Sequence, residues 1–195
     1  MESFETIRQW LNNLDCELLL AANSTHSTLL DQLMWTISGK WTWIPLYVLL
    51  VIITYRKFGI NRCLIILVGT ALLIAVTNQT CAGVIRPLIA RLRPSSPDNP
   101  LSEWVTLVNG YRGGHYGFPS CHAANTIALA LFLSLLFKNR YFTVTILSWC
   151  LLVSYSRIYL GVHYPGDITG GYLVGGTFAL LWYWIYKRAL RICLF

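Results

Sequence analysis

Charged residues are scarce in this sequence of 195 residues: they make up 12% of it, about half of the share usual in soluble globular domains. Hydrophobic residues make up 55%, and the mean hydropathy is +0.54. This composition is too apolar for a soluble domain of this size. It predicts an all-α, polytopic membrane protein, a helical bundle that forms one membrane-embedded domain over residues 1–195.

The first residues lack the pattern of a cleavable signal peptide. Glu2, Glu5 and Arg8 stand where such a peptide has a basic region followed by an apolar core. We therefore expect the mature protein to be the whole chain.

The sequence gives no support for binding of nucleic acid or of zinc. The formal charge of +7 does not indicate nucleic acid, because the basic residues are scattered among hydrophobic spans and form no basic helix. Anionic lipid is the better partner. The six cysteines lack the paired spacing of a zinc site or a disulfide framework. We interpret them as small buried hydrophobic residues: Cys16, Cys63, Cys81, Cys121, Cys150 and Cys193.

Low-charge runs of about 20 residues, the length that crosses a bilayer, recur along the chain. We predict five transmembrane spans: a shorter one at 41–55, then 63–85, 118–137, 141–160 and 168–186. The short run can cross if Lys40 extends to the interface and its tryptophans lie in the interfacial belt.

Residues 1–40 carry charges that are costly at the centre of a bilayer, including Asp15, Glu17 and Asp31. We predict two short amphipathic helices that lie in the interface, the second starting at residues 23–25. A sixth, irregular span is the alternative.

The connections between spans differ sharply in charge. Residues 56–62, residues 138–140 and the tail with Lys187, Arg188 and Arg191 hold eight basic residues and no acidic one. The positive-inside rule places these three segments in the cytoplasm. The connections at 86–118 and 160–167 then face outward.

One outward-facing stretch combines a cation, an imidazole and a carboxylate: Arg157, His163 and Asp167. Asp167 lies four positions after His163, which is close enough on a helical turn for the carboxylate to orient the imidazole. An interfacial salt bridge with a charge on the helix dipole is the alternative interpretation.

A second group of cations follows the second span. Arg86 and Arg93 are seven residues apart, so on a helix they share one face, about 10.5 Å apart along the axis, and both can reach one anion. Pro87 is expected to kink this extension. Arginines that extend to lipid headgroups are the alternative. The following loop, residues 95–117, is long enough to be a lid or a headgroup-recognition loop, in which Arg112 and His115 either touch substrate or are solvated.

The third span opens with Pro119, Ser120 and His122. Proline suits the first position of a helix, whose free N–H groups bind anions. Ser120 adds a hydroxyl group and His122 a titratable proton, although the two residues could simply cap a helix.

Together these stretches resemble the type 2 phosphatidic acid phosphatase superfamily, integral-membrane lipid phosphatases related in fold to vanadium haloperoxidases and glucose-6-phosphatase. The family pattern is Lys-x6-Arg-Pro, then Pro-Ser-Gly-His, then Ser-Arg-x5-His-x3-Asp. The third motif matches in full, the first has Arg for Lys, and the second has Cys for Gly. The matching residues are Arg86 and Arg93-Pro94, then Pro119-Ser120-Cys121-His122, then Ser156, Arg157, His163 and Asp167.

The resemblance implies a role for each site residue. His163 would attack phosphorus to give a phosphohistidine, Asp167 would hold its tautomer, and His122 would serve as acid and base. The phosphate would be bound by Arg86, Arg93, Ser120 and Arg157.

No metal and no cofactor is expected, because the outer face offers only Asp167, with Asp98 and Glu103 in the loop, where a two-metal site needs several ligands. A cysteine phosphatase is set aside, because no cysteine is followed by an arginine six positions on. A serine nucleophile at Ser120 stays open.

A small five-span member with an outward site resembles bacterial inner-membrane enzymes whose site faces the periplasm. The expected reaction removes phosphate from a membrane lipid phosphate or diphosphate: lipid A phosphate, undecaprenyl diphosphate or a phospholipid phosphate. A non-catalytic lipid-phosphate-binding protein and a phosphatase of a soluble phosphate ester are the alternatives. The oligomeric state is left open.

Overall fold

The computed structural model describes residues 2–192, with side chains for residues 5–189; Cys193 and the side chain of Arg191 lie outside this part. The described residues form helices and connecting loops and no β-sheet. The elements in chain order are α1 (Glu2–Asn23), α2 (Thr28–Ser38), η1 (Lys40–Trp43), α3 (Ile44–Gln79), η2 (Thr80–Ile85), α4 (Arg86–Ile89), η3 (Pro100–Glu103), η4 (Val108–Gly110), α5 (Cys121–Phe137), α6 (Arg140–Tyr159) and α7 (Pro165–Ile192). The predicted all-α class is confirmed.

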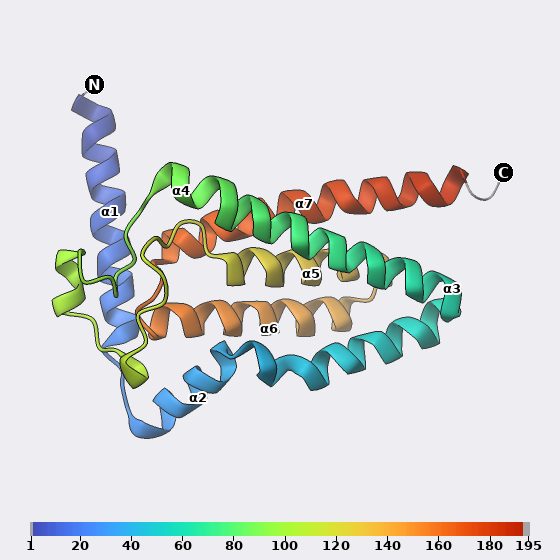
Figure 1. Ribbon diagram of the computed structural model, residues 1–195, viewed down its shortest axis with the longest axis horizontal. Coiled ribbons are helices and arrows are strands. Elements are labelled where there is room, and N and C mark those ends of the chain that lie inside the picture. Colours follow the sequence, from blue (N-terminus) through green and yellow to red (C-terminus); the bar gives the residue numbers. More distant parts are fainter. Residues whose placement is uncertain (1, 193–195) are drawn as a thin grey trace.

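The spanning helices run side by side along the long axis of the molecule (Figure 1). Three helical segments are long and apolar enough to cross a membrane, Lys40–Ile89, Arg140–Tyr159 and Pro165–Ala189, and Cys121–Phe137 is a shorter apolar helix. The first segment reverses direction at Gly59, whose φ of 75° favours a residue without a side chain. It therefore runs along the bundle twice, which confirms a membrane helical bundle; the number of five transmembrane spans stays a prediction.

The helix α5 forms the centre of the bundle and packs against α3, α6 and α7. Its buried face includes four alanines, Ala123, Ala124, Ala128 and Ala130. Glycines of α7 lie against this face, and a Cβ added at Gly175 would come within 2.1 Å of the Ala124 carbonyl oxygen. Small residues on both helices let the two backbones approach closely, the usual basis of helix association in lipid.

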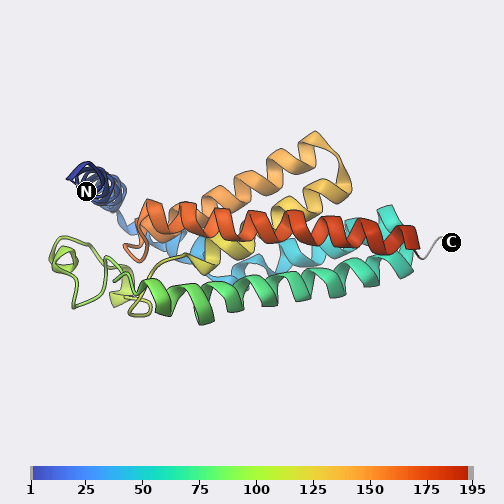
Figure 2. The same ribbon diagram turned by 90° about the horizontal axis from the view of Figure 1, so that it is seen from above.

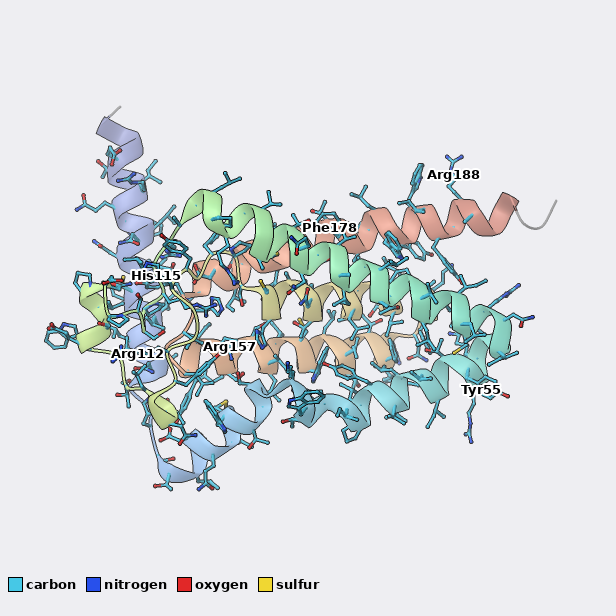
Figure 3. All side chains as sticks on the ribbon, viewed as in Figure 1. Tyr55, Arg112, His115, Arg157, Phe178 and Arg188 are labelled. Atoms are coloured by element: carbon cyan, nitrogen blue, oxygen red, sulfur yellow. The ribbon has the colours of Figure 1, made fainter. Side chains whose placement is uncertain are left out.

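The basic segments gather at one end of the bundle. Lys57, beside the reversal in α3, donates a hydrogen bond to the carbonyl oxygen of Phe137 at the end of α5. Figure 3 shows Tyr55 and Arg188 at this end and Arg112, His115 and Arg157 at the other. The loops that carry the predicted site residues therefore lie opposite the basic turns.

The helix α1 lies across the loop end of the bundle, nearly perpendicular to the spanning helices (Figures 1 and 2). It spans 22 residues, so the expectation of two short helices is wrong for the first of them. Its exposed apolar side chains recur at helical spacing, as an amphipathic helix in a membrane interface requires: Ile7, Trp10, Leu11, Leu14 and Leu18. That α1 and α2 lie in the interface stays a prediction.

The junction between α1 and α2 is tied to the bundle by Asn23, which is 2% exposed. Its Nδ2 donates to the carbonyl oxygen of Tyr159 at 2.7 Å, and its Oδ1 accepts from the backbone N–H of Thr106 at 2.8 Å. The second helix starts later than predicted, because Ser27 rather than residues 23–25 caps it, accepting from the N–H of Leu30 at 3.3 Å.

Candidate active site

The third motif folds as the end of α6, a tight turn and the start of α7. His163, in the turn, is 1% exposed, and Asp167, in the first turn of α7, is fully buried. The His163 Nδ1 lies 3.2 Å from Asp167 Oδ2, which also accepts from the backbone N–H of Tyr164 at 3.1 Å. This is the contact that the four-residue spacing predicted. It favours a proton on Nδ1, which leaves the lone pair of Nε2 for other chemistry.

Arg93 faces the other nitrogen of this imidazole. Its Nη1 lies 2.9 Å from His163 Nε2 and donates to the Val162 carbonyl oxygen at 2.9 Å, while Nε donates to the Tyr116 carbonyl oxygen at 3.0 Å. The side chain is only 6% exposed. The guanidinium is therefore held against the turn on one side and against the long loop on the other.

The predicted helical relation between Arg86 and Arg93 is wrong. The helix α4 ends at Ile89, and Ala90 adopts the left-handed conformation with φ 49°. Arg93 lies beyond the helix in a segment that pairs with the long loop, since its N–H donates to the His115 carbonyl oxygen at 3.1 Å and Leu92 bridges to Tyr116. The two arginines still approach one site, but the loop brings Arg93 there.

Arg86 and Arg157 are both short of hydrogen-bond partners. Arg86 Nη2 donates to the Pro119 carbonyl oxygen at 3.0 Å and to Cys121 Sγ at 2.9 Å. Arg157 donates to Ser38 Oγ and, at 3.3 Å, to the hydroxyl oxygen of Tyr111. The Nε atoms of both arginines are buried and have no hydrogen bond within the described residues. Unpaired buried donors of this kind suit an anionic ligand.

The start of α5 differs in detail from the prediction. Ser120 is the N-cap and Cys121 the first helical residue, so Pro119 precedes the cap instead of occupying the first position of the helix. The Oγ of Ser120 accepts from the N–H of Ala123 at 3.5 Å, and its own N–H donates to the Asp167 carbonyl oxygen at 2.9 Å. The hydroxyl group of Ser120 therefore caps α5, and its backbone N–H joins the first turn of α5 to the first turn of α7.

His122 occupies the first turn of α5 and is half-buried. No hydrogen bond joins its ring to another residue in the part of the chain that the structure describes. The ring is therefore available to a ligand.

The electrostatics around His163 favour its neutral form. Burial, followed by the charges of Arg93 and Arg157, lowers the pKa of His163 well below its usual range, with smaller effects of His122 and Arg86. Burial and the neighbouring Arg86 and Arg157 also lower the pKa of Arg93 to about 10, so Arg93 stays charged at neutral pH. A neutral imidazole thus faces a cluster of cations.

Four contributors to the site were missed from the sequence. Arg91 donates to Asp167 Oδ1 at 2.9 Å and to Asp15 Oδ2 at 2.6 Å. Ser38 and Tyr111 hold Arg157. Arg91 stands between Arg86 and Arg93, so its position was a usable signal, but no local spacing links Asp15, Ser38 or Tyr111 to the motifs.

The long loop at 95–117 is tied to itself as well as to Arg93. Arg112 Nη1 donates to the Ser95 carbonyl oxygen at 2.8 Å, and His115 Nδ1 lies 3.4 Å from Asp98 Oδ2. Of the two interpretations of Arg112 and His115, these contacts favour loop residues over substrate ligands. Among the described residues, no three His, Cys, Asp or Glu side chains come together as a metal ion would require.

Comparison with known proteins shows the family of the chain. A sequence model of the PAP2 superfamily matches residues 62–191. The lipid A 4'-phosphatase of Bacteroides thetaiotaomicron is 44% identical over 185 residues, 94% of this chain and 82% of that protein. The lipid A 4'-phosphatase of Porphyromonas gingivalis is 37% identical over 92% of this chain and 74% of its own length. The undecaprenyl-diphosphatase of Sulfolobus acidocaldarius is 30% identical over 85% of this chain and 75% of its own length.

A solved structure shares the fold. The PAP2 type phosphatidylglycerolphosphate phosphatase from Bacillus subtilis superposes with a TM-score of 0.67 at 22% identity, covering 91% of this chain and 87% of the other. The helical arrangement is therefore that of a known membrane phosphatase.

Proposed function

The chain belongs to the PAP2 superfamily and is an integral-membrane phosphatase, and from this premise we propose that it hydrolyses lipid phosphates without a metal, through a phosphohistidine at His163. The observation that carries the proposal is the contact of His163 Nε2 with Arg93 at 2.9 Å, opposite the contact of Nδ1 with Asp167. A neutral imidazole whose free lone pair faces a cation is positioned to attack an anionic phosphate that binds to the same cation.

In the first step, the Nε2 lone pair attacks phosphorus and the bond between phosphorus and the lipid oxygen breaks. His122 gives its proton to the departing oxygen, which leaves as an alcohol or as a lipid phosphate. In the second step, neutral His122 takes a proton from water, the water oxygen bonds to phosphorus, and the P–N bond breaks to release phosphate. Asp167 holds the Nδ1 proton throughout and stabilises the imidazolium charge.

The arginines bind the phosphoryl oxygens, where charge stabilisation supplies most of the catalysis in phosphoryl transfer. Arg86 and Arg157 each have a buried Nε without a partner among the described residues. When phosphate binds, Arg93 exchanges its contact with Nε2 for one with a phosphoryl oxygen, which frees the nucleophile. Ser120 acts as the cap that presents the first N–H groups of α5 rather than as a nucleophile.

The preferred substrate within this class is a sugar-linked lipid phosphate, as in lipid A. A pocket of about 490 Å³ lies between α2 and the 3-10 turn η4, and its lining includes Asp31, Gln32, Trp35 and Asn109. The Trp35 ring packs edge-on against Tyr111 at 5.4 Å, and Tyr111 accepts a hydrogen bond from Arg157. These contacts connect the wall of the pocket, at Trp35, to the phosphate-binding Arg157 through Tyr111. An exposed aromatic ring among carboxylate and amide groups suits a hydroxyl-rich sugar better than a prenyl chain.

The relatives support this preference, since two of those described above are named lipid A 4'-phosphatase. Undecaprenyl diphosphate is the second candidate, because a third relative is named for it. We further propose that the protein lies in a bacterial inner membrane with its site toward the periplasm. The separation of Lys57 and Arg188 from the site end supports this orientation.

Phosphate release by the purified protein in EDTA tests the proposal. The panel is lipid A, undecaprenyl diphosphate, phosphatidate and glucose-6-phosphate in mixed micelles. We expect at least ~10-fold higher kcat/KM for the lipids than for glucose-6-phosphate, because several buried methylenes contribute about 0.8 kcal/mol each. Absence of release from every compound in the panel would support the non-catalytic alternative, and release fastest from glucose-6-phosphate would support the soluble ester.

Two experiments test the substrate preference and the identity of the nucleophile. Gln32→Ala should lower kcat/KM for lipid A by about 10-fold and leave undecaprenyl diphosphate unchanged, with the exposed Leu29→Ala on the same helix as the control. Equal effects on both substrates would show that the pocket does not bind the sugar.

After brief incubation with labelled substrate, the protein should carry an alkali-stable, acid-labile phosphoryl group. Label that persists in His163→Ala would show that another residue is the nucleophile.

A further inference from the structure

A partly buried ionic chain links the N-terminal helix to the nucleophile. Arg91 bridges two carboxylates: Nη2 lies 2.6 Å from Asp15 Oδ2, and Nη1 lies 2.9 Å from Asp167 Oδ1. The side chains of Arg91, Asp15 and Asp167 are 25%, 11% and 0% exposed. We infer that Asp15 is a positioning residue for the reaction, acting through Arg91 and Asp167 on the orientation of His163.

Both oxygens of Asp15 are used in this chain. Oδ2 holds Arg91, and Oδ1 accepts a hydrogen bond from the backbone N–H of Gly166 at 2.6 Å. Gly166 immediately precedes Asp167, and a Cβ added there would meet Asp15 Oδ2 at 2.7 Å. Asp15 therefore fixes the first turn of α7 through the backbone as well as through the arginine.

Both carboxylate oxygens of Asp167 are also held by hydrogen bonds. Its Oδ1 accepts from Arg91, and its Oδ2 contacts His163 and accepts from the N–H of Tyr164. Arg91 also stacks on the Tyr164 ring, with its guanidinium carbon 4.0 Å from the ring centroid. Loss of Asp15 would leave Arg91 with one carboxylate in place of two. The Arg91 side chain would then be held by Asp167 alone and could turn toward solvent. Asp167 would lose its fixed position, and with it the imidazole of His163 would lose its fixed orientation.

This contribution comes from outside the part of the chain that defines the family. Asp15 lies on α1, and the match to the PAP2 superfamily covers residues 62–191. The same helix exposes the apolar stripe that includes Trp10 and Leu14. A helix that lies across the loop end of the bundle thus supplies part of the support for His163.

The inference rests on the proposed function, since it requires His163 to be the reacting group. The test uses the full chain in mixed micelles and measures kcat and KM with the preferred lipid, with thermal unfolding in parallel. Asp15→Asn keeps an acceptor for Gly166 but removes the charge that holds Arg91. We expect kcat to fall about 10-fold with KM within about 2-fold of wild type, because positioning of the nucleophile affects the chemical step rather than binding.

The matched control is Glu17→Gln, the same change two residues further along α1 at an exposed position. It should retain wild-type kcat. Asp15→Glu should recover part of the loss, since it restores the charge. Arg91→Gln should lower kcat at least as much as Asp15→Asn, and the double variant should be no slower than Arg91→Gln alone, because both changes interrupt one chain.

Three results would overturn the inference: wild-type kcat in Asp15→Asn, an equal loss in Glu17→Gln, or multiplied losses in the double variant. A loss that follows a lowered unfolding temperature and is not recovered by Asp15→Glu would make Asp15 a structural residue only, which also overturns it. If the wild-type protein releases phosphate without forming phosphohistidine, the proposed mechanism fails, and the inference fails with it. If phosphohistidine forms and Asp15→Asn forms it at the wild-type rate, only the inference fails.

Discussion

Replacing Gly171 by alanine should reduce activity far more than replacing Gly176, five residues along the same helix. A Cβ at Gly171 would lie 2.5 Å from the carbonyl oxygen of Ser120 and 3.1 Å from the backbone nitrogen of Ala124. These atoms form the first turn of α5, where Ala124 donates to the Ser120 carbonyl at 2.9 Å. A Cβ at Gly176 would meet only Leu131 Cδ2, at 4.0 Å.

The magnitude follows from the displacement that the new methyl group requires. Ordinary van der Waals contact needs 3.4–4 Å, so the backbone at Ser120 has to move by about 1 Å. Overpacking of this kind costs about 1–3 kcal/mol of stability. A 1 Å misplacement of catalytic groups lowers rates by about 100-fold. Ser120 caps this turn and His122 lies in it, so we expect kcat of Gly171→Ala to fall by about 100-fold.

The assay is phosphate release in mixed micelles at saturating lipid, with thermal unfolding measured on the same preparations. Gly176→Ala should keep kcat within about 2-fold of wild type and gain up to ~1 kcal/mol in stability from helix propensity. If the Gly171→Ala protein is folded and as active as Gly176→Ala, the close approach of α5 and α7 does not position the catalytic groups, and the reasoning is refuted.

Three further outcomes are expected. His122→Ala should slow hydrolysis of a lipid phosphate by about 100- to 10,000-fold but spare a nitrophenyl phosphate, whose leaving group needs no proton; equal losses would make His122 a binding residue. Because the pKa of His163 is lowered, its imidazole stays neutral as the pH falls. The acidic limb of kcat/KM, after correction for the titration of the substrate, should therefore lie below about pH 6.5, the usual pKa of histidine. A limb above that value would contradict the assignment of His163 as the nucleophile. In a cysteine-free variant in intact cells, an impermeant maleimide should label a cysteine at Asn109 and not one at Asn61; the reverse would invert the topology.

The spans and the close-range contacts could be predicted from the sequence, because each depends on neighbours along the chain. A bilayer requires long apolar runs, so the passes and the reversal within 56–62 follow from composition alone. The contact of His163 with Asp167 follows from a spacing of four residues at the start of a helix. The family resemblance added the grouping of three motifs, and the comparisons confirm the superfamily itself.

The remaining features depend on contacts between distant segments. Asp15 and Arg91 are 76 residues apart, and Arg157 and Ser38 are 119 apart, so no periodicity connects them. The position of Arg93 was predicted wrongly because helical spacing was extended past Ala90, where a left-handed residue ends the helix. An alanine gives little warning of that conformation, and only the loop contacts around Arg93 explain it.

The shortness of α5 has a consequence for the depth of the site. A helix of 17 residues is about 26 Å long, whereas the hydrocarbon core of a bilayer is about 30 Å thick. With Lys138 at one boundary, the end near His163 stops about 4 Å short of the opposite boundary. Because α3, α6 and α7 surround α5 and none of its side chains is exposed, protein rather than lipid encloses this gap. A lipid would therefore lower its phosphate group below the headgroup boundary to reach His122, while its chains stay in the leaflet.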